Sequence, residues 1–396
     1  LVSMFAIAAN MMAADHVMAA TKHAPKQEVP ATLNLSLQEA QDYAVETNRS
    51  LKNASLAVQK AYATRWQTIA SMLPSVDMSW AYQSMMGYKM NLGGMPIEMP
   101  DNGTLGITAS VGINGQAIVG ALLNNTAIEM QKLNLEISED DLRASVKSSY
   151  ASVLVLEDVV KLLDSSLKNI ENLAAMTQRS VEVGAAEQTT ADQILVRVNT
   201  LKNNINANKR STQLAINALK VLLNVPAETE LTLTTQLSDM LSAEAIVALL
   251  GKDFVLENNL SYQTLAKNVE LAKKNVHMAG WAYGPTVGVG YQYSEKDYFG
   301  KKEGFNMTPP NALSIQVSMP LWSSGKRAAG VVEKKIALEE ARNTFEETAD
   351  NLGIQNEQLR YNLQNAYETY TNEQENMGVT QRVFDNTSLK FQQGVA

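Results

Sequence analysis

The side chains best suited to metal or nucleophilic chemistry are scarce and far apart in this 396-residue chain. Its only histidines are His16, His23 and His277, and their spacing matches no standard pattern of zinc ligands. There is no cysteine, which excludes disulfides, thiolate metal sites and a cysteine nucleophile. We therefore predict neither a bound metal nor a cofactor.

Carboxylate pairs and glycine-rich stretches are the remaining candidates for acid–base or phosphate chemistry. Glu139–Asp140–Asp141 and Glu346–Glu347 fall in helical patterns, where runs of charge typically mark a solvated face. The stretch "GVGYQY", from Gly288, has the pattern of a strand, and "SSGKR", from Ser323, lacks the upstream glycine and the following Ser/Thr of a phosphate-binding loop. These features predict that the protein is not an enzyme.

Composition narrows the class of partner. The chain has 33 Lys and Arg against 41 Asp and Glu, whereas nucleic-acid binders usually present a basic surface. We predict no nucleic-acid partner. Residues 1–20 are apolar with a small-residue ending, which predicts the remnant of a secretory signal peptide. Residues 21–34, which contain two prolines, are predicted to be a linker.

Four stretches, near residues 76–83, 105–114, 287–294 and 312–321, alternate apolar and polar residues with the period of two that is typical of a β-strand. Each predicted strand therefore has one apolar and one wet face. The apolar face includes Val76, Met78, Trp80, Val287, Val289 and Tyr291. The polar face includes Asp77, Ser79, Gln83, Gln292 and Gln316.

The length of these strands suits two different environments. About nine to eleven residues is the length of a tilted strand that crosses a bilayer, so the apolar set would face lipid and the polar set a lumen. A soluble antiparallel sheet packed on a helix has the same alternation. Because open edges are not tolerated in lipid, four membrane strands would need other chains to close a barrel; three chains would supply twelve strands.

The helical patterns are much longer than a compact domain requires. The longest, 116–182, would extend about 100 Å at 1.5 Å per residue. Its apolar positions step by four and three, as in a coiled coil. They are Val146, Tyr150, Val153, Leu156, Val160, Leu163, Leu167, Ile170 and Ala174. Such a helix packs laterally on neighbours and leaves a broad face in water, which a fibrous coiled coil also does.

A tight helical hairpin is predicted where this helix ends. Gly184 suits the position after a helix that requires a left-handed backbone, and Thr189 or Thr190 is predicted to cap the next helix. The hairpin tip is then "VGAA", which includes Val183, Gly184 and Ala185. Gly394 and Val395 are the corresponding residues at the other end of the chain.

The chain also repeats internally. A shift of about 211 residues superposes "ETNRSLKNASLAVQKA" (from Glu46) on "ENNLSYQTLAKNVELA" (from Glu257), and "LPSVDMSWAY" on "GPTVGVGYQY". Ser36 and Glu39 form a predicted capping box for the first helix, which is expected to continue to about residue 72. We predict a first repeat over 35–240 and a second over 241–396 that lacks its final helix.

Together these features resemble the TolC-type outer-membrane efflux proteins over residues 35–396. The resemblance rests on "LSLQEAQDYAVETNRSLKNASLAVQKA" before "LPSVDMSWAY", on "VSMPLWSSGKRAAGV", on "VEVGAAEQTTADQ" at the tip, and above all on the duplicated order of helix, strand pair, long helix and glycine turn. It implies an α+β, mostly helical chain. Three copies would join a coiled-coil tunnel to a twelve-stranded barrel.

The resemblance also implies a function and partners. A homotrimer in outer-membrane lipid would extend into the periplasm and dock on an adaptor (membrane fusion) protein fed by an inner-membrane pump. It would be a passive exit duct for efflux or type I secretion. Its adaptor contacts would lie at Val183, Gly184 and Ala185 and at Gly394 and Val395. The rival interpretation is an extended coiled-coil interaction or structural protein outside any membrane.

Overall fold

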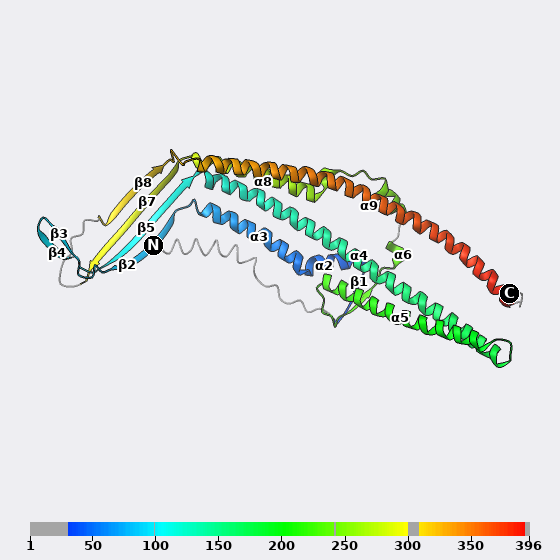
Figure 1. Ribbon diagram of the computed structural model, residues 1–396. Helices are drawn as coiled ribbons and strands as arrows, with labels where there is room; N and C mark the ends of the chain where they lie inside the picture. The colour runs from blue at the N-terminus through cyan, green and yellow to red at the C-terminus, as the bar shows by residue number, and fades with distance from the viewer. Residues whose placement is uncertain (1–30, 99, 241–242, 300–308, 393–396) are drawn as a thin grey trace. The chain divides into compact units, whose positions relative to one another are not determined.

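The computed structural model describes residues 31–98, 100–240, 243–299 and 309–392 (Figure 1). Its helices are α2 (Leu37–Thr47), α3 (Arg49–Ala70), α4 (Gly115–Glu182), α5 (Gln188–Leu222), α6 (Leu237–Met240), α7 (Ala243–Leu250), α8 (Leu260–Gly280) and α9 (Lys326–Gln392), with 3-10 turns η1 (Leu256–Asn258) and η2 (Trp281–Tyr283). None of the helices in these ranges combines the length and the apolarity that a membrane crossing requires.

The strands in the described ranges form three separate sheets. They are β1 (Thr32–Leu35), β2 (Ser75–Gln83), β3 (Lys89–Leu92), β4 (Met95–Glu98), β5 (Asn102–Asn114), β6 (Glu230–Leu233), β7 (Thr286–Tyr298) and β8 (Asn311–Ser318). The largest sheet has the order β2-β5-β7-β8 and is antiparallel throughout; β1 pairs with β6 in parallel, and β3 pairs with β4. All four predicted strands are therefore present, although β8 ends at Ser318 rather than near residue 321.

The first helical segment starts as predicted but does not run unbroken to residue 72. The Ser36 side chain accepts from the Glu39 amide, and Glu39 accepts from the Ser36 amide at 2.8 Å, which completes the capping box. Asn48 then leaves the helical region, with ψ at 127°. Its Oδ1 accepts from the Ser50 amide at 2.8 Å and so caps a new helix, α3. The predicted single helix is two.

The internal repeat is visible at this break. Asn259, which lies 211 residues after Asn48, has nearly the same backbone angles and directly precedes α8. The first strand residues Ser75 and Thr286 are separated by the same interval. The helix of the second repeat that corresponds to α3, α8, starts at Leu260 after the turn η1.

The chain divides into two compact units, and each takes residues from both predicted repeats. We call the described residues of 57–133 and 261–348 the sheet unit, and those of 21–56, 134–260 and 349–396 the helical unit. The helices α4 and α9 contribute residues to both.

The helical unit has a closed apolar core. Tyr150, Val146 and Val153 on α4 and Leu219 and Leu223 from α5 and its end are all 0% exposed. The remaining positions of the predicted apolar stripe on α4, from Leu156 to Ala174, are half-buried, as expected for a helix that packs on one side.

A short parallel ladder joins distant segments of the helical unit at this core. β1, which lies at the end of the predicted linker, pairs residue by residue with β6, from Thr32 with Glu230 to Leu35 with Leu233. The Tyr150 hydroxyl donates to the Leu35 carbonyl at 3.0 Å and accepts from the Thr235 amide at 3.0 Å. The buried phenol thus satisfies backbone groups on both sides of the ladder.

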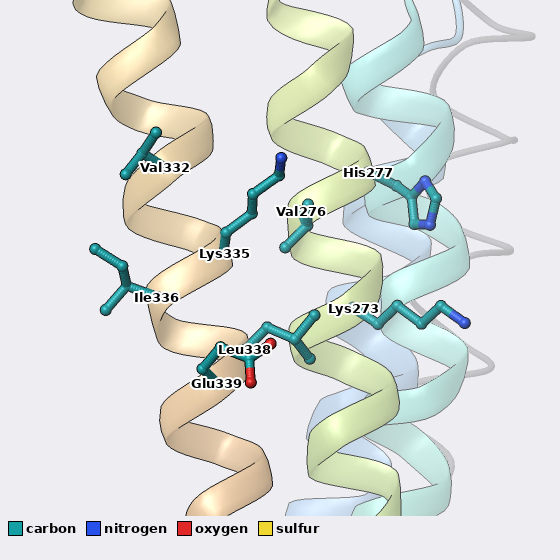
Figure 2. Close-up of a pocket in the computed structure, with 8 residues that line it drawn as sticks. All are labelled: Lys273, Val276, His277, Val332, Lys335, Ile336, Leu338 and Glu339. Carbon is teal, nitrogen blue, oxygen red and sulfur yellow. The ribbon is translucent and has the colours of Figure 1, made fainter.

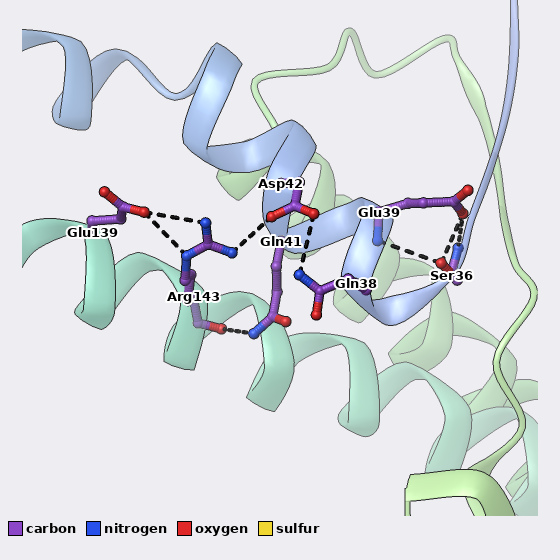
Figure 3. A network of polar contacts seen from close by, with 7 residues as sticks. All are labelled: Ser36, Gln38, Glu39, Gln41, Asp42, Glu139 and Arg143. Carbon is purple, nitrogen blue, oxygen red and sulfur yellow. Dashed lines mark hydrogen bonds and ion pairs between the residues drawn. The ribbon is translucent and has the colours of Figure 1, made fainter.

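Arg143 fastens α2 to α4 beside this core (Figure 3). Its guanidinium binds Asp42 at 2.8 Å and Glu139 at 3.1 Å, while its carbonyl accepts from the Gln41 side chain at 3.0 Å. The hydrogen bond from Arg143 lowers the pKa of Asp42, with a smaller contribution from Gln38. Both carboxylates are solvent-accessible, so the pairing orients the helices more than it stabilises them.

Candidate functional site

The strands β2, β5, β7 and β8 lie side by side in one sheet of the sheet unit (Figure 1). The register of this sheet places the predicted apolar residues on one face. Its register aligns them in rows across the strands. These rows are Val76–Ala109–Tyr291–Leu313, Met78–Ile107–Tyr293, Trp80–Leu105, Val111–Val289–Ile315 and Ile113–Val287–Val317. Since side chains of directly paired residues lie on the same side of a sheet, the register brings together an apolar set that the sequence scatters over about 240 positions.

The opposite face collects the small and polar residues in the same way. Its rows include Asp77–Thr108–Gln292, Ser75–Ser110–Gly290–Ser314, Ser79–Gly106–Ser294, Gly112–Gly288–Gln316 and Gln83–Asn102. The five predicted polar-face residues are thus on one side, and the six predicted apolar-face residues on the other. Whether these sides meet a lumen and lipid stays a prediction.

The apolar face is exposed in the single chain, and so are both edge strands. Met78 is 75% exposed and Ile315 is 70% exposed. Every residue of β2 and of β8 is exposed, and within the described residues each of these strands has a partner on one side only. A large exposed apolar surface with unpaired strand edges marks a surface that needs another molecule to cover it.

The junction between this sheet and its helices is tightly packed. A Cβ on Gly115, the first residue of α4, would lie 2.2 Å from the Trp281 ring, so only glycine fits there. In the first turn of α9, the Arg327 guanidinium lies 5.0 Å from the centre of the Tyr283 ring, and its Nε donates to the Ser323 hydroxyl at 2.9 Å. These contacts fix the positions of the strand ends relative to α4, α8 and α9 within the sheet unit.

The hairpin tip between α4 and α5 forms at the predicted residues. Gly184 has φ at 76°, its amide donates to the Val181 carbonyl at 3.0 Å, and the Ala185 amide donates to the Ser180 carbonyl at 2.8 Å. This pair of bonds is the Schellman motif. Val183 is 79% exposed. Gly394 and Val395 lie outside the described residues.

The predicted cap of the next helix was wrong by two or three residues. Glu187 occupies the N-cap position, and its side chain makes no capping bond. Thr189 lies inside α5 and donates instead to the Glu187 carboxylate at 3.1 Å. The turn after Gly184 is shorter than the sequence suggested, because the Schellman bonds complete it by Ala186.

The single described histidine lines a groove rather than a reactive site (Figure 2). This groove has a volume of 530 Å³ and lies between α8 and α9. Val276 and Leu338 fill the seam between the helices, whereas Lys273 and His277 point away from α9 (Figure 2). In the described part of the chain, no three His, Cys, Asp or Glu side chains are arranged to hold a metal ion.

The most strongly perturbed carboxyl group belongs to a network between α4 and α8. Glu270 accepts from Lys274 at 2.7 Å and from Lys267 at 3.2 Å, and Lys267 also binds Glu129 at 2.7 Å. The two lysine hydrogen bonds, that of Lys274 first, lower the pKa of Glu270 to about 2. The buried Thr126 hydroxyl accepts from Lys274 at 2.6 Å. A carboxylate paired in this way joins helices and is unsuited to proton transfer near neutral pH.

The sequence interpretation missed one element of the sheet unit. No strand was predicted in the segment 87–103, but β3 and β4 form an antiparallel hairpin there. Gly93 and Gly94, both with positive φ, make its two-residue turn. A Gly-Gly pair between apolar residues is a known hairpin signal, and it was available in the sequence to predict this element.

Comparison with known protein families finds a match in the first half of the chain. Residues 41–225 match the sequence model of the outer membrane efflux protein family. No curated protein is significantly similar to the chain in sequence. The resemblance stated from the sequence motifs is therefore confirmed.

Solved structures with the same fold cover most of the chain. The CmeC outer membrane channel of Campylobacter jejuni aligns with a TM-score of 0.72 at 16% identity, over 91% of this chain and 77% of CmeC. CusC, from a study of folding and transmembrane channel formation, aligns with a TM-score of 0.70 at 16% identity, over 95% and 87%.

The open state of the Neisseria gonorrhoeae MtrE outer membrane channel aligns with a TM-score of 0.58 at 17% identity, over 80% of this chain and 70% of MtrE. At these identities the likeness concerns the fold. It confirms the predicted fold class, a mostly helical chain with long helices and four sheet-forming strands.

Proposed function

We propose that three copies form a passive exit duct in the outer membrane, because residues 41–225 match the outer membrane efflux protein family and the fold is shared with outer membrane channels. Each chain contributes its four-stranded sheet to a twelve-stranded barrel, and its long helices to a tunnel that extends into the periplasm. The duct supplies no energy. It offers a wet path that a pump loads from the other end.

The observation that carries this proposal is the sheet with two unpaired edges and one exposed apolar face. Backbone groups at an open edge have no partner in lipid, so β8 of one copy must pair with β2 of the next. The exposed face, with Met78 at 75% and Ile315 at 70%, then meets lipid instead of water. The polar face, with Asp77, Ser79 and Gln292, lines the lumen.

The finer part of the proposal concerns the partners. An adaptor protein, which an inner-membrane pump feeds, docks on the hairpin tips, and Val183, Gly184 and Ala185 are the proposed contact residues. The exposed Val183 side chain at a tight turn supports this placement. Adaptor contacts open the tips when they stabilise an open arrangement more than a closed one.

Engineered cysteines test the pairing between copies directly, because the chain has none of its own. Ser75→Cys on β2 is combined in turn with Ala312→Cys, Ser314→Cys and Gln316→Cys on β8, and the protein is oxidised in membranes. One of these combinations should yield covalent dimers and trimers. Ser75→Cys with Ser110→Cys, which joins paired residues of one chain, is the matched control and should yield none.

Fractionation of the full chain separates the duct from its rival. A duct is recovered with the outer membrane, needs detergent for solubility, is trimeric in detergent and conducts ions in a planar bilayer. A soluble monomer or dimer, with no β2–β8 cross-link between chains, would instead identify an extended coiled-coil interaction protein.

A further inference from the structure

The helices of the sheet unit lie in the order α3, α4, α8, α9, which is also the order of the strands β2, β5, β7 and β8 that join them (Figure 1). Asn124 of α4 donates to the Thr68 hydroxyl of α3 at 2.8 Å, and Lys274 of α8 donates to the Thr126 hydroxyl of α4 at 2.6 Å. The groove described above separates α8 from α9. Among the described residues of the sheet unit, α3 and α9 therefore each have a helix on one side only.

Both of these outer helices carry exposed apolar side chains. Tyr62 and Trp66, one turn apart on α3, are 46% and 49% exposed, and Val332 and Ile336, one turn apart on α9, are 54% and 55% exposed. Figure 2 shows Val332 and Ile336 on the side of α9 that faces away from α8. Apolar surface of this kind marks a contact that the single chain does not make.

The internal repeat indicates which contact is missing. The interval of 211 residues that relates α3 to α8 places Gln59 on Glu270 and Ala63 on Lys274. The stretch "IVGALL" of α4, from Ile118, corresponds to "AAGVVE" of α9, from Ala328, and this interval of 210 residues places Thr126 on Ile336. Repeats of one structural unit are expected to contact their neighbours through corresponding residues.

Within one chain, α8 covers the position on α4 that corresponds to Ile336. Thr126 is only 2% exposed and accepts from Lys274, which also binds Glu270 at 2.7 Å. On α9 the corresponding side chain, Ile336, is more than half exposed because no described helix follows α9 in the layer. The helix that would cover it corresponds to α8, and that helix is α3 of another copy.

We propose that α9 of one copy packs against α3 of the next copy as α4 packs against α8 within a chain. Ile336 then lies between Gln59 and Ala63 of the neighbouring copy. This inference rests on the proposed duct and deepens it by naming the helix contact between copies. It also continues the pairing of β8 with β2, since β8 leads into α9 and β2 follows α3.

The two junctions differ in chemistry. The junction within a chain is held by the charged pair of Lys274 and Glu270. At the proposed junction between copies, the corresponding residues Ala63, Gln59 and Ile336 carry no charge. Contact between copies in this region therefore depends on burial of apolar surface, which salt does not screen.

A charge introduced at the proposed junction tests it. Ile336→Lys should lower the yield of trimer in detergent about fivefold, because an unpaired ammonium would be buried between the helices. Adding Gln59→Glu should restore most of the yield, since its carboxylate would meet the new ammonium as Glu270 meets Lys274. The matched control is Thr64→Glu, an exposed position that the helical period turns to another side of α3, and it should not restore the yield.

Cross-linking locates the same contact without introducing a charge. Ile336→Cys combined with Ala63→Cys should join different chains through a short bis-maleimide, whereas Thr126→Cys with Lys274→Cys should join residues of one chain only. Absence of the cross-link between chains, or equal rescue by Gln59→Glu and Thr64→Glu, would overturn the contact. The duct is judged separately, by the β2–β8 cross-link and by conductance, so the two proposals can fail independently.

Discussion

Apolar side chains are buried in the core of the helical unit but exposed on the four-stranded sheet of the sheet unit. Around Tyr150 and Val153, apolar side chains are 0% exposed within one chain. On the sheet, Met78 and Ile315 are mostly exposed although they are aligned with other apolar residues. In the helical unit, one chain is enough to bury the apolar side chains. The apolar face of the sheet can be buried only by contact with another molecule. The difference locates where the protein depends on other molecules.

The largest expected loss of stability comes from a substitution in the core of the helical unit. Tyr150→Ala removes a fully buried ring and should lower the free energy of unfolding of the helical unit by about 3–5 kcal/mol. Tyr150→Phe keeps the ring and loses only the two hydroxyl bonds, which should cost about 1–3 kcal/mol. Urea titration followed by circular dichroism measures both, and equal losses would show that the hydroxyl, not the ring, dominates.

On the sheet, a charge on the apolar face should act through assembly. Met78→Lys or Val289→Lys should each destabilise the membrane-inserted form by about 2–4 kcal/mol per chain, because the ammonium would face hydrocarbon. Ser79→Lys, one residue away on the polar face, should assemble normally and alter ion selectivity. Trimer yield from membranes and bilayer conductance give the two readouts. If all three variants assembled alike, the assignment of the two faces would be wrong.

A smaller change in stability is expected at the hairpin tip, where it depends only on the backbone conformation of Gly184. Gly184 has open space around it and a positive φ, so Gly184→Ala should destabilise the hairpin by about 1–2 kcal/mol through backbone strain. Gly353 on α9 is equally unobstructed but helical, so Gly353→Ala should stabilise its helix by about 1 kcal/mol. Thermal unfolding should therefore shift in opposite directions for these two substitutions. A shift in the same direction would mean that Gly184 does not require its left-handed conformation.

The smallest effect is the acid sensitivity of the α4–α8 network in the sheet unit. The pKa of Glu270 is lowered from 4.5 to about 2, so its stabilising contribution is fully present above pH 4.5 and is lost as the pH falls toward 2. Glu270→Gln should flatten this part of the stability profile without changing the slope at neutral pH. Because the side chain is 40% exposed, salt should weaken the effect. A slope between pH 4.5 and 2 that is unchanged in Glu270→Gln would assign the acid loss to other carboxylates.

Sequence reasoning succeeded where the signal is local and periodic. The bounds of α4 were predicted to within one residue, and the turn at Gly184 was placed correctly. It failed where a single side chain decides whether a helix continues or ends. Asn48 sits in a helical pattern, and only its capping bond to Ser50 shows that one helix ends and another begins. The cap at Glu187 was missed for a similar reason, since no side-chain bond marks it.

The amino-acid sequence by itself determined the four long strands and the long helices, which face of each of these strands is apolar, and that the pattern occurs twice. These properties follow from residue type and spacing, so they can be recognised without knowing what each segment contacts. Only the tertiary structure decided the strand order β2-β5-β7-β8, the register that joins Met78 to Ile107 and Tyr293, and the pairing of β1 with β6. Those choices depend on free energies of contact between segments up to about 200 residues apart, which no local pattern records.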